Sequence, residues 1–197
     1  MKVYVINLAS RPDRLDEFQA MAATSISFEV KRFNAVALMD GHQGCTMSHL
    51  TLLRKHINAY PNEFPFAVFE DDCKMLQPWT EVEKSMAQLP EGWDILYLGA
   101  TLNKPLDRFS PNLFRLTDAW ATHAMIYSSR KVVDFILANH NTRKVDVFYR
   151  EEVQKKFNCF ITYPLCATQS NIKSNITKNA NDNENLIIQR YAEFAKP

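Results

Sequence analysis

Short, unbroken runs of apolar residues recur along the chain, and many of their side chains are β-branched or aromatic. A run of this kind predicts a strand that is buried on both faces, as in a sheet with helices on either side. Between residues 26 and 30 the apolar positions instead alternate with polar ones, which predicts a strand with one face toward the core. The predicted strands cover residues 2–8, 26–30, 66–69, 94–99, 112–116, 120–127 and 159–163.

Between the strands, apolar residues recur at the spacing of amphipathic helices. Ser10 and Asp13 flank Pro12, which predicts a helix start, and further helices are expected from Gly44, from Trp79 and from Ser128 or Ser129. Alternation of strands and helices predicts an α/β fold of Rossmann type, with a mostly parallel sheet flanked by helices. We expect residues 1–170 to form this domain, and residues 171–197 to form a polar C-terminal segment with a terminal helix at 186–194.

Composition narrows the class of protein. The chain has 197 residues, 46% of them hydrophobic, which is enough for one domain with a real core. The 23 Lys and Arg residues nearly balance 22 Asp and Glu residues, so no nucleic-acid partner is expected. Neither a transmembrane segment nor a signal peptide is predicted, and the four cysteines lack metal-site spacing, so we expect a cytoplasmic protein with free thiols.

The run 66–69 ends in three consecutive acids, Glu70, Asp71 and Asp72. Ligands of open α/β sheets bind at the carboxyl ends of strands, and adjacent carboxylates there suit a hard divalent cation that holds a diphosphate. The alternative is an acidic turn that is simply solvated.

Other polar side chains also lie where a ligand would be expected to bind. Asn7, Arg11 and Arg14 flank the end of the first strand, where they would meet a nucleotide or phosphate, or else form a capping loop with solvated arginines. Ser48 and His49 follow Gly44, whose lack of a side chain would let a ligand approach the backbone. A helix histidine with a satisfied hydrogen bond is the simpler interpretation of His49.

Two further residues have alternative interpretations. Asp146 stands between apolar neighbours just before an amphipathic segment, where it would cap a helix or act as a partly buried base with a raised pKa. His123 lies within a predicted strand, as a structural residue or as a contact for a substrate. Inverting glycosyl transfer needs a cation on the diphosphate and one carboxylate base, and the chain has candidates for both.

Several motifs occur in the order that is found in glycosyltransferase family 25, and the chain resembles this family over about residues 2–175. The motifs are Val5-Ile6-Asn7-Leu8 with Arg11 and Arg14, Asn34-Ala35-Val36 with Gly41, Gly44-Cys45 with Ser48-His49, Phe69-Glu70-Asp71-Asp72, Asp94-Ile95-Leu96-Tyr97-Leu98-Gly99, and Val145-Asp146.

The resemblance implies a GT-A-like fold, a UDP-sugar donor and inversion of configuration, with UDP-galactose as the favoured donor and Mn²⁺ as the metal. It implies that Asp72, Glu70 and Gln169 are metal ligands and that Asp146 is the catalytic base. The nucleotide pocket would be formed by Asn7, Leu8, Arg11, Arg14, Ala35, Ser48, Glu70, Asp71 and Gly99. The family's last motif often has an aspartate after its serine, whereas this chain has Gln169-Ser170 and then Ser174-Asn175, so the last ligand departs from the pattern.

The sequence thus predicts a galactosyltransferase whose acceptor is a hydroxyl group, on hydroxylysine of a collagen-like protein or on a glycan of lipooligosaccharide; a homodimer is compatible with it. Two alternatives stay open. A catalytically inactive relative would bind a nucleotide sugar or glycan without turnover. A metal-dependent phosphodiesterase would also use the acidic triplet, but with additional carboxylate or histidine pairs.

Overall fold

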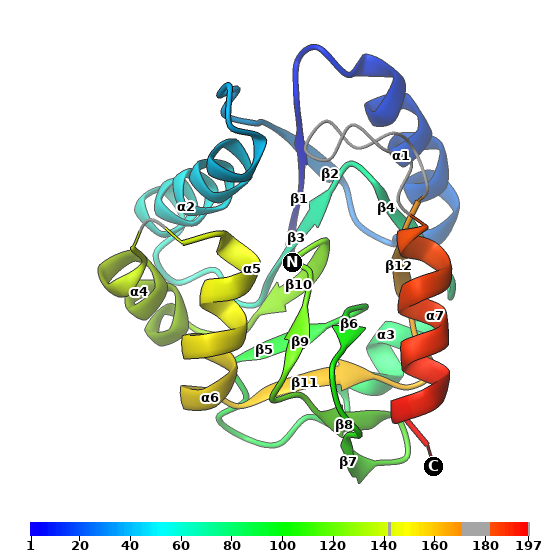
Figure 1. Ribbon diagram of the computed structural model, residues 1–197. Coiled ribbons are helices and arrows are strands. Elements are labelled where there is room, and N and C mark those ends of the chain that lie inside the picture. The colour runs from blue at the N-terminus through cyan, green and yellow to red at the C-terminus, as the bar shows by residue number, and fades with distance from the viewer. Residues whose placement is uncertain (142, 171–181, 197) are drawn as a thin grey trace.

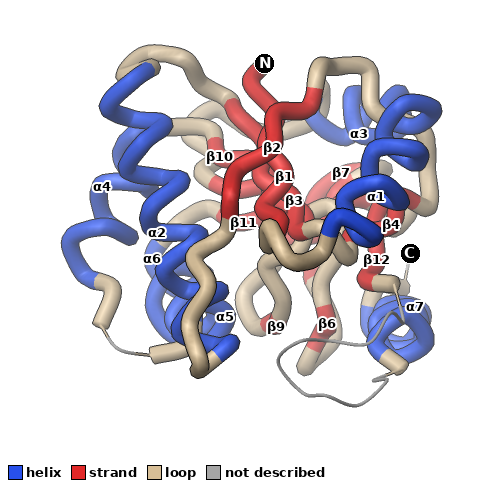
Figure 2. Tube along the Cα trace, turned by 90° about the horizontal axis from the view of Figure 1, so that it is seen from above, coloured by secondary structure: helices blue, strands red, loops and turns tan. Residues whose placement is uncertain are grey.

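The computed structural model describes residues 1–141, 143–170 and 182–196, and it has a mixed sheet at its centre with helices on both faces (Figures 1 and 2). The strand order of this sheet is β2-β1-β3-β10-β5-β11-β8-β7. Its strands are β1 (Lys2–Asn7), β2 (Val30–Asn34), β3 (Phe66–Glu70), β5 (Ile95–Tyr97), β7 (Asp107–Ser110), β8 (Leu113–Arg115), β10 (Ala124–Tyr127) and β11 (Cys159–Thr162).

The α/β class is confirmed, and six of the eight strands that the structure describes in this sheet run the same way, but four of its seven neighbouring pairs are antiparallel. Within the described part of the chain, β10 and β8 are the strands of this sheet that run against the other six. Two small antiparallel pairs accompany it. They are β4 (Cys73–Met75) with β12 (Ala167–Gln169), and β6 (Thr101–Leu102) with β9 (Ala119–Trp120).

Helices cover both faces because the strands between them are apolar on both sides. Phe18 of α1 and Val82 of α3 pack in one core with Ala67 and Phe69 of β3, and Leu52 of α2 packs in the other. The helices are α1 (Pro12–Ser25), α2 (Gly41–Ala59), α3 (Trp79–Met86), α4 (Arg130–Asn139), α5 (Val145–Phe148), α6 (Gln154–Lys156) and α7 (Asn183–Phe194), with a π-helical turn η1 (Tyr149–Val153) between α5 and α6. The helix α7 lies against β6 and β12. None of the helices in these described ranges has the length and apolar character needed to cross a bilayer.

Several boundaries differ from the sequence prediction. The prediction of a strand at residues 26–30 was wrong. Ile26 caps the end of α1, and β2 begins only at Val30, which pairs with Val3. The strands β6 and β7 follow Gly99, in a part of the chain where no strand was predicted. The single strand expected at 120–127 is broken between β9 and β10, where Ala121 has a φ of 80°.

The predicted polar segment begins outside the described residues, since 171–181 are not described. Ser174 and Asn175, where the family pattern was expected to continue, lie in this range. The predicted terminal helix is present as α7 and starts at Asn183, three residues before the predicted start.

Candidate functional site

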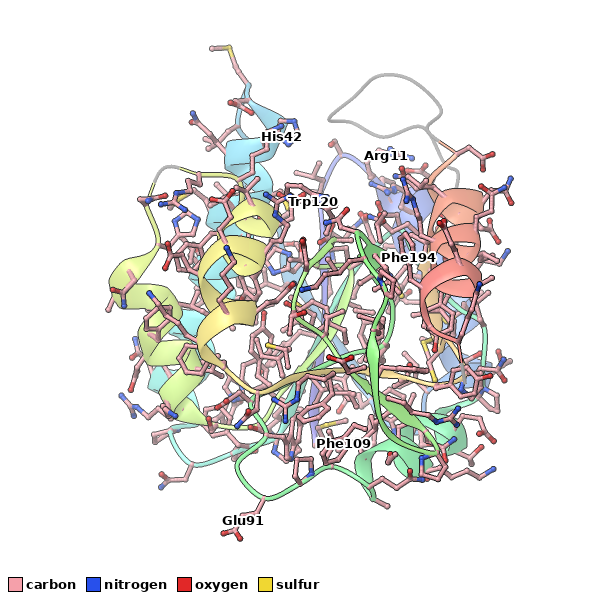
Figure 3. The ribbon with its side chains drawn as sticks, turned by 60° about the horizontal axis from the view of Figure 1, so that its bottom comes forward. Arg11, His42, Glu91, Phe109, Trp120 and Phe194 are labelled. Carbon is pink, nitrogen blue, oxygen red and sulfur yellow. The ribbon has the colours of Figure 1, made fainter. Side chains whose placement is uncertain are left out.

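Two cavities lie side by side at the carboxyl ends of β1 and β3, and both are lined by Cys45, Glu70 and Asp72. The first has a volume of about 290 Å³ and the second about 250 Å³. Each is slightly below the usual range for small-molecule pockets, about 300–1,000 Å³. Figure 3 places His42 and Trp120 toward the same end of the molecule, away from Glu91.

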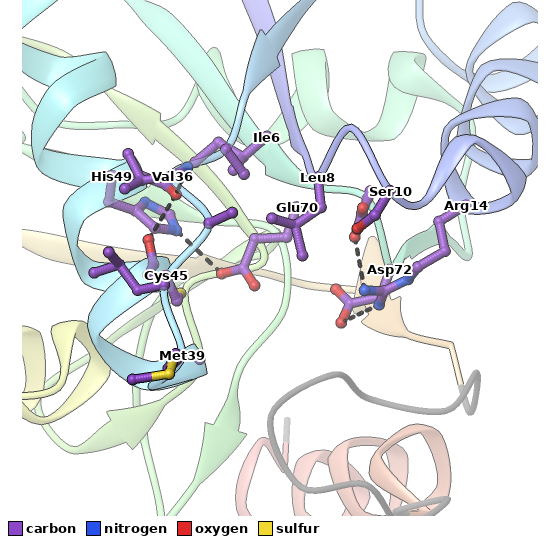
Figure 4. A pocket seen from close by; sticks show the side chains of 17 residues that line it. Ile6, Leu8, Ser10, Arg14, Val36, Met39, Cys45, His49, Glu70 and Asp72 are labelled. Atoms are coloured by element: carbon purple, nitrogen blue, oxygen red, sulfur yellow. Dashed lines mark hydrogen bonds and ion pairs between the residues drawn. The ribbon is translucent and has the colours of Figure 1, made fainter.

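The first cavity is formed by the ends of β1 and β3, by the segment after β2 and by the start of α2 (Figure 4). Seven of the predicted nucleotide or metal residues line it: Leu8, Arg14, Ala35, Ser48, Glu70, Asp71 and Asp72. The second cavity lies between β9, α5 and β12. It brings together Glu70, Asp72, Gln169 and Asp146, the predicted metal ligands and the predicted base.

Arg14 is buried between two carboxylates of the acidic triplet. Its Nη1 lies 3.0 Å from Asp71 Oδ1, and its Nη2 lies 2.8 Å from Asp72 Oδ2. Asn7 Nδ2 donates to Asp71 Oδ2 over 2.7 Å. The interpretation of Arg14 as a solvated residue is therefore wrong, since only 6% of this residue is exposed.

Asp71 and Asp72 differ in how many of their carboxylate oxygens have a partner. Both oxygens of Asp71 have partners, and burial raises its pKa while Arg14 and Asn7 oppose the rise. Asp72 Oδ1 is buried and has no hydrogen-bond partner. Burial, followed by the negative charge of Glu70, raises the pKa of Asp72 to about 7, although Arg14 acts in the opposite direction.

Glu70 has a different environment, toward α2. Its Oε1 lies 3.2 Å from His49 Nε2 and accepts a hydrogen bond from Thr122 Oγ1 over 2.8 Å. Burial alone would raise the pKa of Glu70, but these hydrogen bonds and the charge of His49 lower it to about 2. Glu70 is therefore the carboxylate of the triplet that stays ionised most readily.

Ser48 stabilises the wall of the first cavity through hydrogen bonds to backbone groups. Its Oγ accepts a hydrogen bond from Val36 N over 2.8 Å and donates to Gly44 O over 2.7 Å. A Cβ at Gly44 would lie 2.8 Å from Val36 O. Gly44 therefore lets α2 approach the segment after β2, and Ser48 fixes Val36 beside Ala35.

The second cavity contains an acidic and an aromatic side chain from different elements. Asp146 is in the first turn of α5, half-buried, and its Oδ1 accepts a hydrogen bond from Val147 N over 2.8 Å. Thr46 Oγ1 accepts from Val145 N over 3.0 Å, which ties α5 to α2. Trp120 lies at the end of β9, with the Arg150 guanidinium 3.8 Å from its ring centre.

Three predicted residues line neither cavity. Asn7 is buried and positions Asp71, and Arg11 makes an ion pair with Asp13 over 2.8 Å. Gly99 packs against backbone, since a Cβ there would lie 2.0 Å from Ala167 O.

His123, whose role was left open, is fully buried and lines neither cavity. Burial lowers its pKa to about 4, so it is neutral near pH 7. These facts favour the structural interpretation of His123 over a contact with substrate.

No role was predicted from the sequence for several residues that line the cavities, among them Cys45, Trp120, Thr122, Lys144 and Asn183. Cys45 had a usable signal, because it precedes His49 by four positions on a predicted helix and therefore shares its face. Burial, then the charges of Glu70, Asp72 and Asp146, raise the pKa of the Cys45 thiol well above its usual value. Trp120 and Asn183 reach the site only through tertiary packing.

The oxygen donors at the junction of the two cavities fit a hard divalent cation. Glu70, Asp72 and Gln169 all line the second cavity, and Asp72 Oδ1 is a buried acceptor without a partner. Carboxylate and amide oxygens are the ligands that Mg²⁺, Ca²⁺ and Mn²⁺ prefer.

Comparison with known proteins supports the fold. No model of a known protein family matches the chain, and no curated protein matches it in sequence. The crystal structure of A197 from STIV is similar, with a TM-score of 0.56 and 12% sequence identity over 86% of each chain. The crystal structure of mannose-1-phosphate geranyltransferase from Thermus thermophilus has a TM-score of 0.43 and 9% identity, over 81% of this chain and 58% of that one. At such identities the likeness to A197 concerns the fold alone: this chain has the α/β fold seen in A197.

Proposed function

We propose that this protein is a metal-dependent, inverting glycosyltransferase that moves galactose from UDP-galactose to a hydroxyl acceptor. One observation carries the proposal: two adjacent cavities share the carboxylates of Glu70 and Asp72, and Asp146 lines the second of them. A two-substrate transfer needs two such spaces that meet at the reacting bond.

The nucleotide belongs in the first cavity. Its wall combines apolar side chains such as Leu8 with backbone of the Ala35–Val36 segment, which Ser48 holds in place. Pockets that are mostly apolar with a few fixed polar groups are typical of small-molecule sites. Arg14 lines this cavity beside Asp71 and Asp72, where it limits the repulsion between the diphosphate and the carboxylates.

Glu70, Asp72 and Gln169 would hold Mn²⁺ at the junction of the cavities. When bound, the ion would supply positive charge that stabilises the diphosphate leaving group. Arg14 keeps Asp72 oriented through Oδ2, which leaves Oδ1 as the oxygen without a protein partner.

Asp146 would accept the proton of the acceptor hydroxyl as that oxygen attacks the sugar. The carboxylate is half-buried, so it is reachable from the second cavity while its Oδ1 is fixed by Val147 N. Trp120 presents an aromatic surface in the same cavity, suited to packing against a sugar ring or an aliphatic chain.

The donor and acceptor parts of the proposal come from the resemblance to glycosyltransferase family 25. They are UDP-galactose as donor and Mn²⁺ as ion, and, as acceptor, hydroxylysine of a collagen-like protein or a sugar of a lipooligosaccharide. The proposal includes membership of that family.

The test is UDP release from a panel of UDP-sugars with Mn²⁺ or with EDTA, with a hydroxylysine-containing peptide, with a lactose-type acceptor, or with neither. We expect Mn²⁺-dependent release from UDP-galactose that rises with one acceptor. Asp146→Asn should lower transfer about 100-fold or more while calorimetric UDP affinity stays unchanged. Asp72→Asn should abolish the Mn²⁺ dependence of UDP binding. The control is Asp134→Asn, an exposed acid of α4 that pairs with Arg130.

Two outcomes would contradict the proposal. UDP binding without release from any donor would favour a nucleotide-sugar-binding protein. Metal-dependent hydrolysis of a simple phosphodiester, lost in Asp72→Asn, would favour a phosphodiesterase.

A further inference from the structure

Cys45, His49 and Glu70 form a cluster of which the proposed transferase chemistry uses only Glu70. One ligand atom from each residue lies within 4.8 Å of the other two. Cys45 and His49 are four positions apart on α2, so their side chains share one face of the helix. Glu70 ends β3 and meets that face from the sheet.

The spacing of these atoms fits a tetrahedral metal ion. His49 Nε2 and Glu70 Oε1 are 3.2 Å apart. Two ligands at about 2.0 Å from a tetrahedral Zn²⁺ are themselves separated by about 3.3 Å. The Cys45 sulfur lies within 4.8 Å of both atoms. A tetrahedral zinc ion separates its sulfur and nitrogen ligands by about 3.5 Å, so the sulfur needs a shift of at most about 1.3 Å, which a side-chain torsion can provide.

The electrostatic environment also favours a cation here. Glu70 has 18% of its side chain exposed, and the ion pairs seen in the described residues give it no lysine or arginine partner. Its partners are His49 and the neutral hydroxyl of Thr122. A carboxylate of low exposure is stabilised by a paired charge, and a divalent ion between Glu70 and His49 would replace the charge of His49 in that role.

The chemistry of the donors selects the kind of ion. Thiolate and imidazole favour Zn²⁺, whereas Mg²⁺ and Mn²⁺ prefer oxygen ligands alone. Three protein ligands leave one tetrahedral position open, and Cys45 and Glu70 line both cavities, so solvent can reach that position.

We propose that Cys45, His49 and Glu70 form a zinc site, which shares Glu70 with the oxygen-donor set of Asp72, Glu70 and Gln169. Binding releases the thiol proton to solvent as the Zn–S bond forms. The proton on His49 Nε2 that faces Glu70 also leaves that nitrogen, so that the neutral ring carries its one proton on Nδ1. The inference does not depend on the glycosyltransferase proposal, but a zinc ion held here withdraws Glu70 from the oxygen-donor set.

The first test uses the unaltered protein. Cys45 is the half-buried cysteine, and the other three are buried. Alkylation of the folded protein, located by peptide mass spectrometry, should therefore modify Cys45 first. We expect saturating Zn²⁺ to slow this modification at least tenfold, and Mg²⁺ to leave it unchanged. A Cys45 alkylation rate that Zn²⁺ does not change would overturn the proposal.

The second test measures the metal directly. Co²⁺ should give a thiolate-to-metal absorption band and the visible bands of a tetrahedral ion, and both should vanish in Cys45→Ser. Zn²⁺ affinity, measured by calorimetry, should fall at least tenfold in Cys45→Ser and His49→Gln. It should not change in His140→Gln, the control at the end of α4, because His140 lines neither cavity. Equal affinity in all four proteins would refute the site. If a variant fails to fold, the alkylation result decides, and neither test requires a sugar donor.

Discussion

Replacing Arg14 by methionine tests the interpretation that one buried guanidinium holds two carboxylates of the acidic triplet together. Methionine keeps much of the aliphatic stem but removes the charge and the contacts at 3.0 Å and 2.8 Å to Asp71 and Asp72. The side chains involved are 8% exposed for Arg14, 8% for Asp71 and 18% for Asp72. Solvent therefore screens the remaining repulsion only weakly.

The expected loss of unfolding free energy in Arg14→Met is large. Removing one partner of a buried ion pair costs about 3–5 kcal/mol, because the other charge is left uncompensated. For a chain of this length, that loss lowers the melting temperature by about 10–15 °C. Because two carboxylates lose their counter-charge together, we expect a cost in the upper part of this free-energy range.

The loss should depend on pH with a definite sign. The folded-state pKa values of Asp71 and Asp72 are already raised, that of Asp72 to about 7. Without Arg14 both rise further, so the folded state takes up protons that the unfolded chain releases. The deficit of Arg14→Met in unfolding free energy should be largest at about pH 8 and should shrink toward about pH 3, where both acids are mostly protonated in either state.

Urea unfolding followed by circular dichroism at both pH values measures this. Arg130→Met is the control, because Arg130 and Asp134 form an exposed pair in which each side chain is about half exposed. That change should cost less than about 1 kcal/mol at either pH. A cost below about 1 kcal/mol for Arg14→Met, or a cost that does not vary with pH, would show that Arg14 is not the counter-charge of these carboxylates.

Three further changes test other parts of the fold. Ala121 has a φ of 80°, so Ala121→Gly should raise the unfolding free energy by about 1 kcal/mol in urea titrations, and a loss would contradict the strain. The pKa of His123 is lowered to about 4, so its contribution to stability is full above its ordinary value of 6.5 and is lost as pH falls. Between these two pH values, the unfolding free energy of the wild type should therefore fall by about 3 kcal/mol more than that of His123→Gln. Parallel pH profiles of the two proteins would refute the burial of this residue. Gly99→Ala places a Cβ 2.0 Å from Ala167 O and should cost about 3 kcal/mol or more, measured as the shift in melting temperature. Gly92→Ala, with a φ of +74° and open space around it, is its control and should cost only about 1 kcal/mol.

The strand that carries the acids could be predicted because its signal is local. The apolar run that ends at Glu70 specifies a strand buried on both faces, and the chemistry of three carboxylates needs no tertiary information. The position of Asp146 near Asp72 could be expected only from the family resemblance, since α5 reaches the second cavity through packing against α2.

The break before β10 had no local signal. An alanine in the left-handed region, rather than glycine or asparagine, gives no indication in sequence, and the strand was therefore predicted as continuous. The same holds for Arg14, since sequence alone suggested a phosphate contact or solvent, whereas burial between two aspartates depends on how α1 packs against the end of β3.

The arrangement of the acidic triplet follows from the pleat of β3. Side chains alternate along a strand, so Glu70 follows Val68 toward the face that α2 covers, and Asp71 follows Phe69 toward the face that α1 covers. Glu70 thereby meets His49 and Asp71 meets Arg14, whereas Asp72 lies in the turn after β3 and also pairs with Arg14. One guanidinium for two carboxylates leaves net negative charge at the junction of the cavities, with a buried oxygen of Asp72 unsatisfied. Any cation that binds the folded state there lowers this repulsion and stabilises the fold by mass action, so cation binding and folding stability are coupled through these residues.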